Sequence, residues 1–72
     1  MNEIIFVVEE ASEGGFTASA LGHSLFTEAD DMAALRVNVR EAVECHFEPA
    51  DRPKLIRLHF VHESFLQLNE LQ

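Results

Sequence analysis

The sequence predicts an α+β domain in which an antiparallel sheet carries one helix packed on a face, in the order β-β-β-α-β. Three observations favour this class. Short apolar runs separated by turn residues fill residues 2–28. From Met32 the spacing of the apolar residues changes from two to three or four, and an alternating run returns at residues 55–61. The 72 residues contain no repeat or linker, so a single domain over residues 1–72 is expected.

Four strands are expected, and turn residues separate the first three of them. Their expected bounds are residues 2–10, 16–21, 24–28 and 55–61. Gly14 and Gly15 lie between the first two runs, where glycine adopts the positive φ angles of a tight turn at no steric cost. The first two strands are therefore expected to pair antiparallel.

The first strand is apolar on both of its faces. Ile4, Phe6 and Val8 share one face, and Ile5 and Val7 share the other. This pattern is typical of a strand that is central in its sheet or covered on both sides. Because a single helix covers only one face of the sheet, the second apolar set is expected to need another cover.

One helix is expected to begin at Met32 and to end before Pro49. Its apolar residues recur at spacings of three and four and form one stripe: Met32, Leu35, Val39, Ala42, Val43 and His46. Asp31 is expected to cap the first turn, and the neighbouring Asp30 adds negative charge near the positive end of the helix dipole. The helix must stop at Glu48, since a residue before proline avoids helical angles.

The chain is expected to form a homodimer or a higher oligomer. Residues 63–72 carry Phe65, Leu66, Leu68 and Leu71, which are too apolar for a free end. A domain this small usually needs a disulfide, a metal or self-association, and Cys45 is the only cysteine. An intrachain disulfide is therefore excluded, and a cytoplasmic location is expected.

Charge is distributed unevenly along this acidic chain. The net charge is −8, and residues 1–31 hold seven acids and no Lys or Arg. Nucleic-acid binding depends on Lys and Arg clusters, so direct binding of nucleic acid is not expected. A basic protein partner is favoured, because opposite fields speed encounter. The candidate partner-binding residues are Glu9, Glu10, Glu13, Glu28, Asp30 and Asp31.

No motif of catalysis, metal binding or cofactor binding is recognisable. The clustered acids are expected in a solvated turn, whereas acid–base work needs carboxyls in a partly dry site. His59 and His62 would face opposite sides of a strand, and adjacent Cys45 and His46 would diverge on a helix. We therefore expect no enzyme activity, no cofactor and no metal. No apolar run approaches the roughly 20 residues of a membrane span.

Two segments resemble the HicB antitoxin family. They are "EGGFTASALG", residues 13–22, and "DDMAALRVNVREAVECHF", residues 30–47. Within the second segment, Asn38, Glu41 and Ala42 match the family's "A-x-x-N-x-x-E-A" helix. The ending "RPKLIRLHFVHE", residues 52–63, looks like a small stand-alone branch of these domains.

This resemblance implies a partial ribonuclease-H-like fold that has lost the catalytic carboxylates. It also implies dimerisation and a partner similar to HicA, a small basic RNA-cleaving toxin with a fold like that of double-stranded-RNA-binding domains. Many HicB proteins carry a C-terminal DNA-binding domain. Only about ten residues follow the expected fourth strand here, so DNA binding is not carried over.

The sequence therefore predicts a non-catalytic protein-binding module, an antitoxin-like neutraliser of a HicA-like toxin. Two alternatives stay open. One is an orphan homodimeric structural or regulatory domain whose toxin partner has been lost. The other, less favoured, is a metal-dependent nuclease that uses Glu9, Glu10 and His59.

Overall fold

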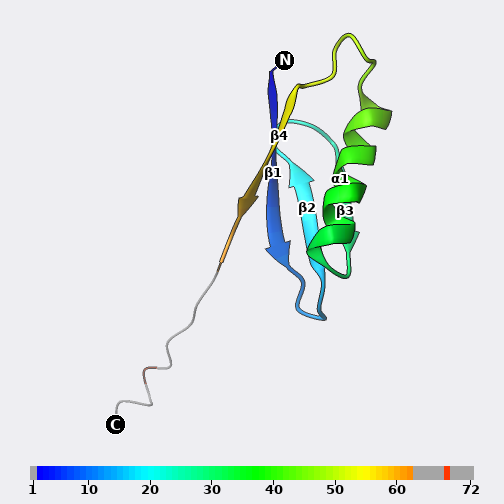
Figure 1. Cartoon of the computed structure of the whole chain (residues 1–72). Helices are drawn as coiled ribbons and strands as arrows, with labels where there is room; N and C mark the ends of the chain where they lie inside the picture. The colour runs from blue at the N-terminus through cyan, green and yellow to red at the C-terminus, as the bar shows by residue number, and fades with distance from the viewer. Residues whose placement is uncertain (1, 63–67, 69–72) are drawn as a thin grey trace.

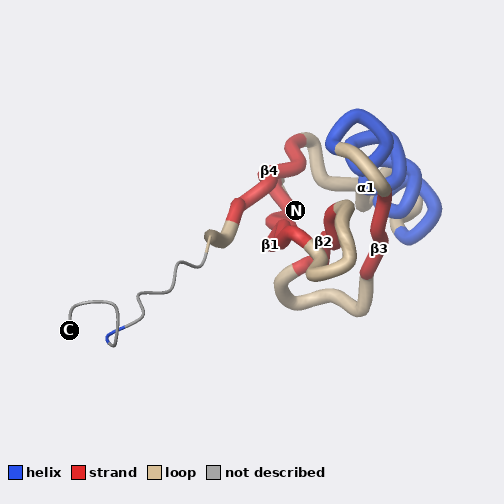
Figure 2. The backbone as a smooth tube through the Cα atoms, turned by 90° about the horizontal axis from the view of Figure 1, so that it is seen from below, coloured by secondary structure: helices blue, strands red, loops and turns tan. Residues whose placement is uncertain are grey.

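The computed structural model describes residues 2–62 and Leu68, and its elements follow the predicted order β-β-β-α-β (Figure 1). They are β1 (Glu3–Glu10), β2 (Phe16–Ala20), β3 (Phe26–Ala29), α1 (Met32–His46) and β4 (Leu55–Phe60). The four strands form one sheet, and α1 lies on one face of it (Figure 2). The α+β class with a single helix on the sheet is thus confirmed.

The sheet is mixed, whereas an antiparallel sheet was predicted. Its strand order is β3-β2-β1-β4. The first three strands pair antiparallel, but β4 pairs parallel with β1. The cause is the helix, which returns the chain to the edge where β1 begins, so that the Lys54 and Leu55 N–H groups both donate to the Asn2 carbonyl at 3.1 Å.

The third strand lies later in the chain than predicted. It spans Phe26–Ala29 instead of residues 24–28. The Ala20 N–H donates to the Leu25 carbonyl at 3.0 Å, which continues the β2–β3 register by one pair, and residues 21–24 form the connection between the strands. The other strands differ from their predicted bounds by one residue at an end.

The hydrophobic core lies between the sheet and α1. Ile4, Phe6 and Val8 of β1 are buried as predicted, and Ile5 and Val7 lie on the opposite face. Ala18 of β2 and three helix residues complete the core, namely Leu35, Val39 and Val43. Fully burying a side chain of this kind contributes roughly 1.5–3 kcal/mol of hydrophobic free energy.

The predicted start of the helix is confirmed, and the helix ends at His46, two residues before the predicted stop at Glu48. The Asp31 side chain accepts a hydrogen bond from the Ala34 N–H at 2.8 Å. At the other end the Phe47 N–H donates to the Val43 carbonyl at 3.1 Å, ahead of Pro49. Within the described residues, no helix is long and apolar enough to cross a membrane.

His46 does not join the buried stripe on which it was placed. His46 is exposed, and its ring packs edge-on against the rings of His23 and Phe47. The distances between ring centroids are 6.0 and 4.8 Å, respectively. The buried stripe ends one turn earlier, at Val43, and Phe47 packs against the core beyond it.

The sheet face away from the helix is open and mixes apolar with polar and charged side chains. Three large side chains on it are more than half exposed: Leu21, Phe26 and Leu55. Arg57 also lies there and donates to the Glu3 carboxylate at 2.8 Å, which raises the pKa of this guanidinium above its ordinary value. The predicted apolar tail lies outside the described residues except for Leu68, which is 76% exposed.

Candidate functional site

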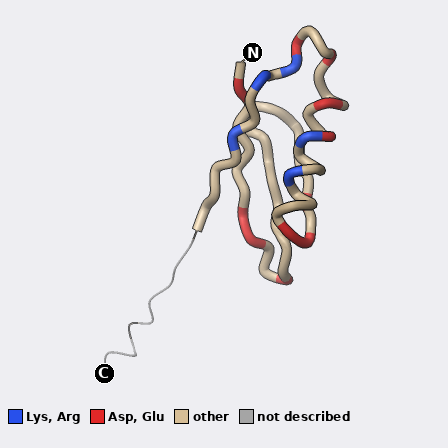
Figure 3. The backbone as a smooth tube through the Cα atoms, in the orientation of Figure 1, with Lys and Arg blue, Asp and Glu red and all other residues tan. Residues whose placement is uncertain are grey.

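The six predicted partner-binding acids gather at one end of the molecule, which we call the acidic end. They are Glu9, Glu10, Glu13, Glu28, Asp30 and Asp31. All six are exposed. Figure 3 shows acidic segments where β1 ends, at the β1–β2 hairpin and where α1 begins, whereas the basic segments lie along α1 and beside β4.

The hairpin between β1 and β2 shapes this end. The Ala11 N–H donates to the Gly15 carbonyl and the Gly14 N–H donates to the Ala11 carbonyl, both at 3.0 Å. Gly14 and Gly15 have φ angles of 101° and 80°, so both predicted glycines adopt the left-handed conformation. A Cβ atom at Gly15 would lie 2.7 Å from the Ala29 carbonyl oxygen. The hairpin therefore packs directly on the end of β3, which holds Glu13 beside the start of the helix.

Four of the six acids line a shallow hollow between the hairpin, β3 and α1. Its volume is about 710 Å³. We call it the acidic hollow, and its acidic lining residues are Glu13, Glu28, Asp30 and Asp31. The lining combines acids that lie fifteen to eighteen positions from Glu13 in the sequence. The structure thus brings together most, but not all, of the predicted set.

Glu9 and Glu10 lie beside the acidic hollow and do not line it. They are the last residues of β1 and point to opposite faces of the sheet. Glu9 pairs with Thr17 and Glu10 pairs with Phe16 across the β1–β2 ladder. These two acids extend the anionic surface around the rim of the sheet.

Asn38 is a site residue that charge analysis did not identify. Its Nδ2 donates to the Glu28 carbonyl at 3.1 Å, and it lines the acidic hollow. This bond ties the second turn of α1 to β3. The only signal for it in the sequence was the match of Asn38 to the helix motif of the HicB resemblance. Together with the Asp31 cap, it fixes the helix start relative to the hollow.

The acidic end has no intramolecular counterion among residues 2–62. The ion pairs of these residues are Arg40 with Glu44, at 3.6 Å, and Arg57 with Glu3, at 2.8 Å. Neither includes a residue of the acidic end. The field of the six carboxylates is therefore uncompensated within the described residues, and it is suited to accept hydrogen bonds from Lys and Arg of another molecule.

The remaining candidate chemistries are a metal site, a reactive thiol and a nuclease set. Within the described part of the chain, no group of three His, Cys, Asp or Glu residues lies close enough to hold a metal ion. Cys45 is an exposed free thiol. His59 pairs with Val7 on the open sheet face and so lies away from the helix side of the molecule. Glu9, Glu10 and His59 line neither the acidic hollow nor the pocket between α1 and β4.

Fold and site together define a small α+β domain with a rigid anionic surface at one end. Among known proteins, the chain is 56% identical over 52 residues to a UPF0150 protein of Archaeoglobus fulgidus, covering 72% of this chain and 77% of that one. It is 33% identical over 61 residues to a UPF0150 protein of Thermotoga maritima, covering 85% and 86% of the two chains. The chain belongs to the family of UPF0150 proteins. No family model and no solved structure matches it.

Proposed function

We propose that this chain is a non-catalytic protein-binding module that neutralises a small basic RNA-cleaving toxin of the HicA type. The observation that carries the proposal is the acidic end, where six exposed carboxylates have no ion-pair partner among residues 2–62. The HicB resemblance of residues 13–22 and 30–47, which includes the hairpin and the helix start, supports the same partner.

The chemistry of neutralisation follows from competition for cations. A protein that cleaves RNA must hold the phosphate backbone with Lys and Arg. Carboxylates at the acidic end offer the same cations an alternative set of oxygen acceptors, and charge-assisted hydrogen bonds of this kind are about twice as strong as neutral ones. Bound toxin would then lack the cations with which it holds RNA.

Rigidity makes the acidic end suitable for this role. The hairpin packs on β3 at Gly15, Asp31 caps the helix, and Asn38 ties the helix to β3. The acids are therefore presented on a fixed frame, so that little conformational entropy is lost on binding. A cytoplasmic location, where RNA is available as the toxin's substrate, is part of the same proposal.

A charge-reversal variant tests the proposal against a matched control. In the test variant Glu10, Glu13 and Asp30 become Lys, and Asp31 is kept because it caps the helix. The control reverses three exposed acids outside the acidic end, namely Glu41, Glu48 and Asp51. Both variants change the net charge equally.

Stopped-flow association with a HicA-like protein from the same genome is then measured at several salt concentrations. We expect the test variant to associate at least tenfold more slowly at low salt and to show a flatter salt dependence, because local charge steers encounter. We expect a much smaller change in the control. Equal rates for the two variants would contradict the proposal.

The open sheet face favours a second candidate, an orphan homodimeric structural or regulatory domain. Leu21, Phe26 and Leu55 are 56%, 63% and 54% exposed on this face. Exposed apolar patches of this kind mark interaction sites. A stable dimer in sedimentation equilibrium, together with no binding of HicA-like proteins, would favour this candidate over neutralisation.

A further inference from the structure

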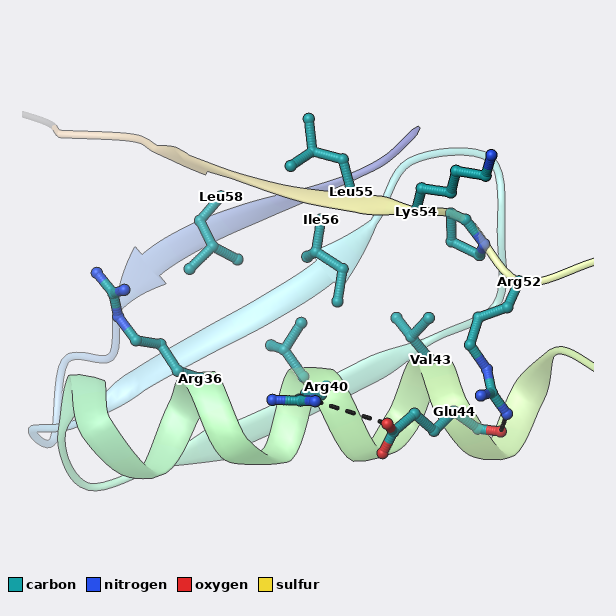
Figure 4. A pocket seen from close by; sticks show the side chains of 11 residues that line it. Arg36, Arg40, Val43, Glu44, Arg52, Lys54, Leu55, Ile56 and Leu58 are labelled. Carbon is teal, nitrogen blue, oxygen red and sulfur yellow. Dashed lines mark hydrogen bonds and ion pairs between the residues drawn. The ribbon is translucent and has the colours of Figure 1, made fainter. Parts of the chain in front are cut away.

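Four of the five Lys and Arg residues of the chain line one groove between α1 and β4 (Figure 4). We call it the cationic groove, and its basic residues are Arg36, Arg40, Arg52 and Lys54. Its volume is about 460 Å³. The fifth cation, Arg57, pairs with Glu3 on the opposite sheet face. Such a concentration of positive charge is unexpected in a chain whose net charge is −8.

The groove exists because the helix does not cover the whole sheet. α1 lies closest to β3 and β2, so the helix-facing side of the edge strand β4 is only partly covered. Ile56 and Leu58 of β4 remain half-buried there, and Val39 and Val43 form the neighbouring wall. In Figure 4 the side chains of Ile56 and Leu58 point toward α1 across this space. The groove therefore combines an apolar floor with a cationic rim.

Only some of the basic side chains of the cationic groove form hydrogen bonds or ion pairs within the chain. Arg52 donates to the carbonyls of Glu44 and Phe47 at 3.0 and 3.5 Å, which ties the connector to the helix end. Arg40 lies 3.6 Å from Glu44 in an exposed pair, an interaction worth little. Arg36 and Lys54 form no ion pair with any residue of the described part of the chain.

A complementary ligand must bring apolar side chains and carboxylates without cations. Residues 63–72 of this chain have that composition: their apolar residues are Phe65, Leu66, Leu68 and Leu71, their acids are Glu63 and Glu70, and Lys and Arg are absent. Leu68 is 76% exposed in the single chain. The segment is also long enough, since ten extended residues reach about 33 Å and the helix rises only about 12 Å from Arg36 to Glu44.

We propose that residues 63–72 of a second copy of this chain bind in the cationic groove, and that two copies exchange these segments reciprocally. Apolar side chains of the segment would cover Ile56 and Leu58, and Glu63 and Glu70 would face the basic rim. A reciprocal exchange fills both grooves and gives a closed two-fold dimer. The inference does not rest on the proposed function, because the cationic groove and the acidic hollow share no lining residue.

The direction of β4 favours binding to a second copy over binding within the same chain. The Val61 N–H still donates to the Val8 carbonyl at 3.0 Å, so the hydrogen bonding between β1 and β4 continues past Phe60. The chain leaves at the Leu58 end of the groove and would have to reverse its direction to enter it. Within residues 61–64, Gly, Pro, Asn and Asp are absent, and Ser64 is the one residue of a type that supports a tight reversal.

Two charge-reversed chains test the exchange. In the first, Arg36→Glu and Arg40→Glu make the groove anionic. In the second, Glu63→Lys and Glu70→Lys make the segment cationic. Each variant alone opposes like charges, so we expect its self-association to weaken at least tenfold in sedimentation equilibrium. When the two variants are mixed, each groove can bind a segment of opposite charge. We therefore expect a heterodimer to form at the protein concentrations at which the wild type dimerises.

Control measurements separate this result from its alternatives. Circular dichroism checks that each variant is folded, and Arg57→Glu, which reverses the one cation outside the groove, is expected to leave self-association unchanged. A variant carrying all four changes in one chain is expected to self-associate as the wild type does. The proposal is overturned if the wild type is a monomer. It is also overturned if the mixture and the four-change variant both stay monomeric, or if Arg57→Glu alone abolishes the dimer.

Discussion

The acidic end and the cationic groove lie on one small domain and are built in different ways. The acidic end comes from residues 9–31, which are close in the sequence, and it is exposed and polar. The cationic groove joins α1 to β4 across the connector, and its charges surround buried and half-buried aliphatic residues. An exposed anionic surface favours fast, salt-sensitive encounter, whereas a groove with an apolar floor favours a lasting contact. The comparison therefore separates two kinds of partner.

The largest effect is expected from a substitution in the hydrophobic core, because both the acidic end and the cationic groove depend on it. Phe6 is completely buried between the sheet and α1. We expect Phe6→Ala to lower the free energy of unfolding by about 3–5 kcal/mol, because it removes apolar contacts and leaves a cavity. Urea unfolding followed by circular dichroism measures this loss. Phe26→Ala on the open face, where the ring is 63% exposed, is the control and is expected to change stability much less.

A glycine substitution sharpens the comparison by altering the acidic end alone. Gly15→Ala forces a side chain into a positive φ and against the Ala29 carbonyl oxygen, whereas Gly14→Ala meets a positive φ with open space around it. We expect Gly15→Ala to lower the free energy of unfolding by about 2–4 kcal/mol and Gly14→Ala by about 1–2 kcal/mol. Thermal unfolding of the two variants gives the difference. Equal losses would mean that the hairpin does not pack on β3 in solution.

A smaller effect is expected from the helix cap. Asp31→Ala removes the acceptor of the Ala34 N–H and should cost about 1 kcal/mol of the free energy of unfolding. Asp30→Ala, one residue earlier, removes a carboxylate for which the structure shows no hydrogen bond within the described residues, and we expect a change of a few tenths of a kcal/mol. If the two variants lose equal stability, the assignment of Asp31 as the cap is wrong.

The smallest effect is expected at the open face. Arg57 and Glu3 form an exposed pair, and such pairs contribute little to stability in salt. We expect Arg57→Gln to leave the urea midpoint unchanged within error at physiological ionic strength. A clear loss would show that the open face is covered in solution, since burial makes a broken ion pair costly.

Local patterns explain why the acidic end was predictable from the sequence. The turn glycines, the helix cap and the run of acids each depend on residues a few positions apart, and the structure places all of them where the pattern indicated. The buried face of β1 followed from simple alternation. The convergence of Glu13 with Glu28, Asp30 and Asp31 in one hollow needed only the hairpin and the short β3.

The cationic groove was not predictable because it depends on how distant elements pack. No spacing rule indicates that β4 pairs parallel with β1, or that α1 lies closest to β3 and β2 and covers β4 only in part. In the sequence, Arg36, Arg40, Arg52 and Lys54 are scattered among acids. The misplaced start of β3 has the same origin, since pairing with β2 sets its limits.

Hydrogen–deuterium exchange on the chain, with and without a HicA-like protein from the same genome, tests the central claim most directly. The account predicts slower exchange on binding at the backbone amides of residues 11–17 and 28–38, which surround the acidic hollow, and unchanged exchange at residues 52–58 beside the cationic groove. Protection that falls on residues 52–58 and spares the acidic hollow would contradict it.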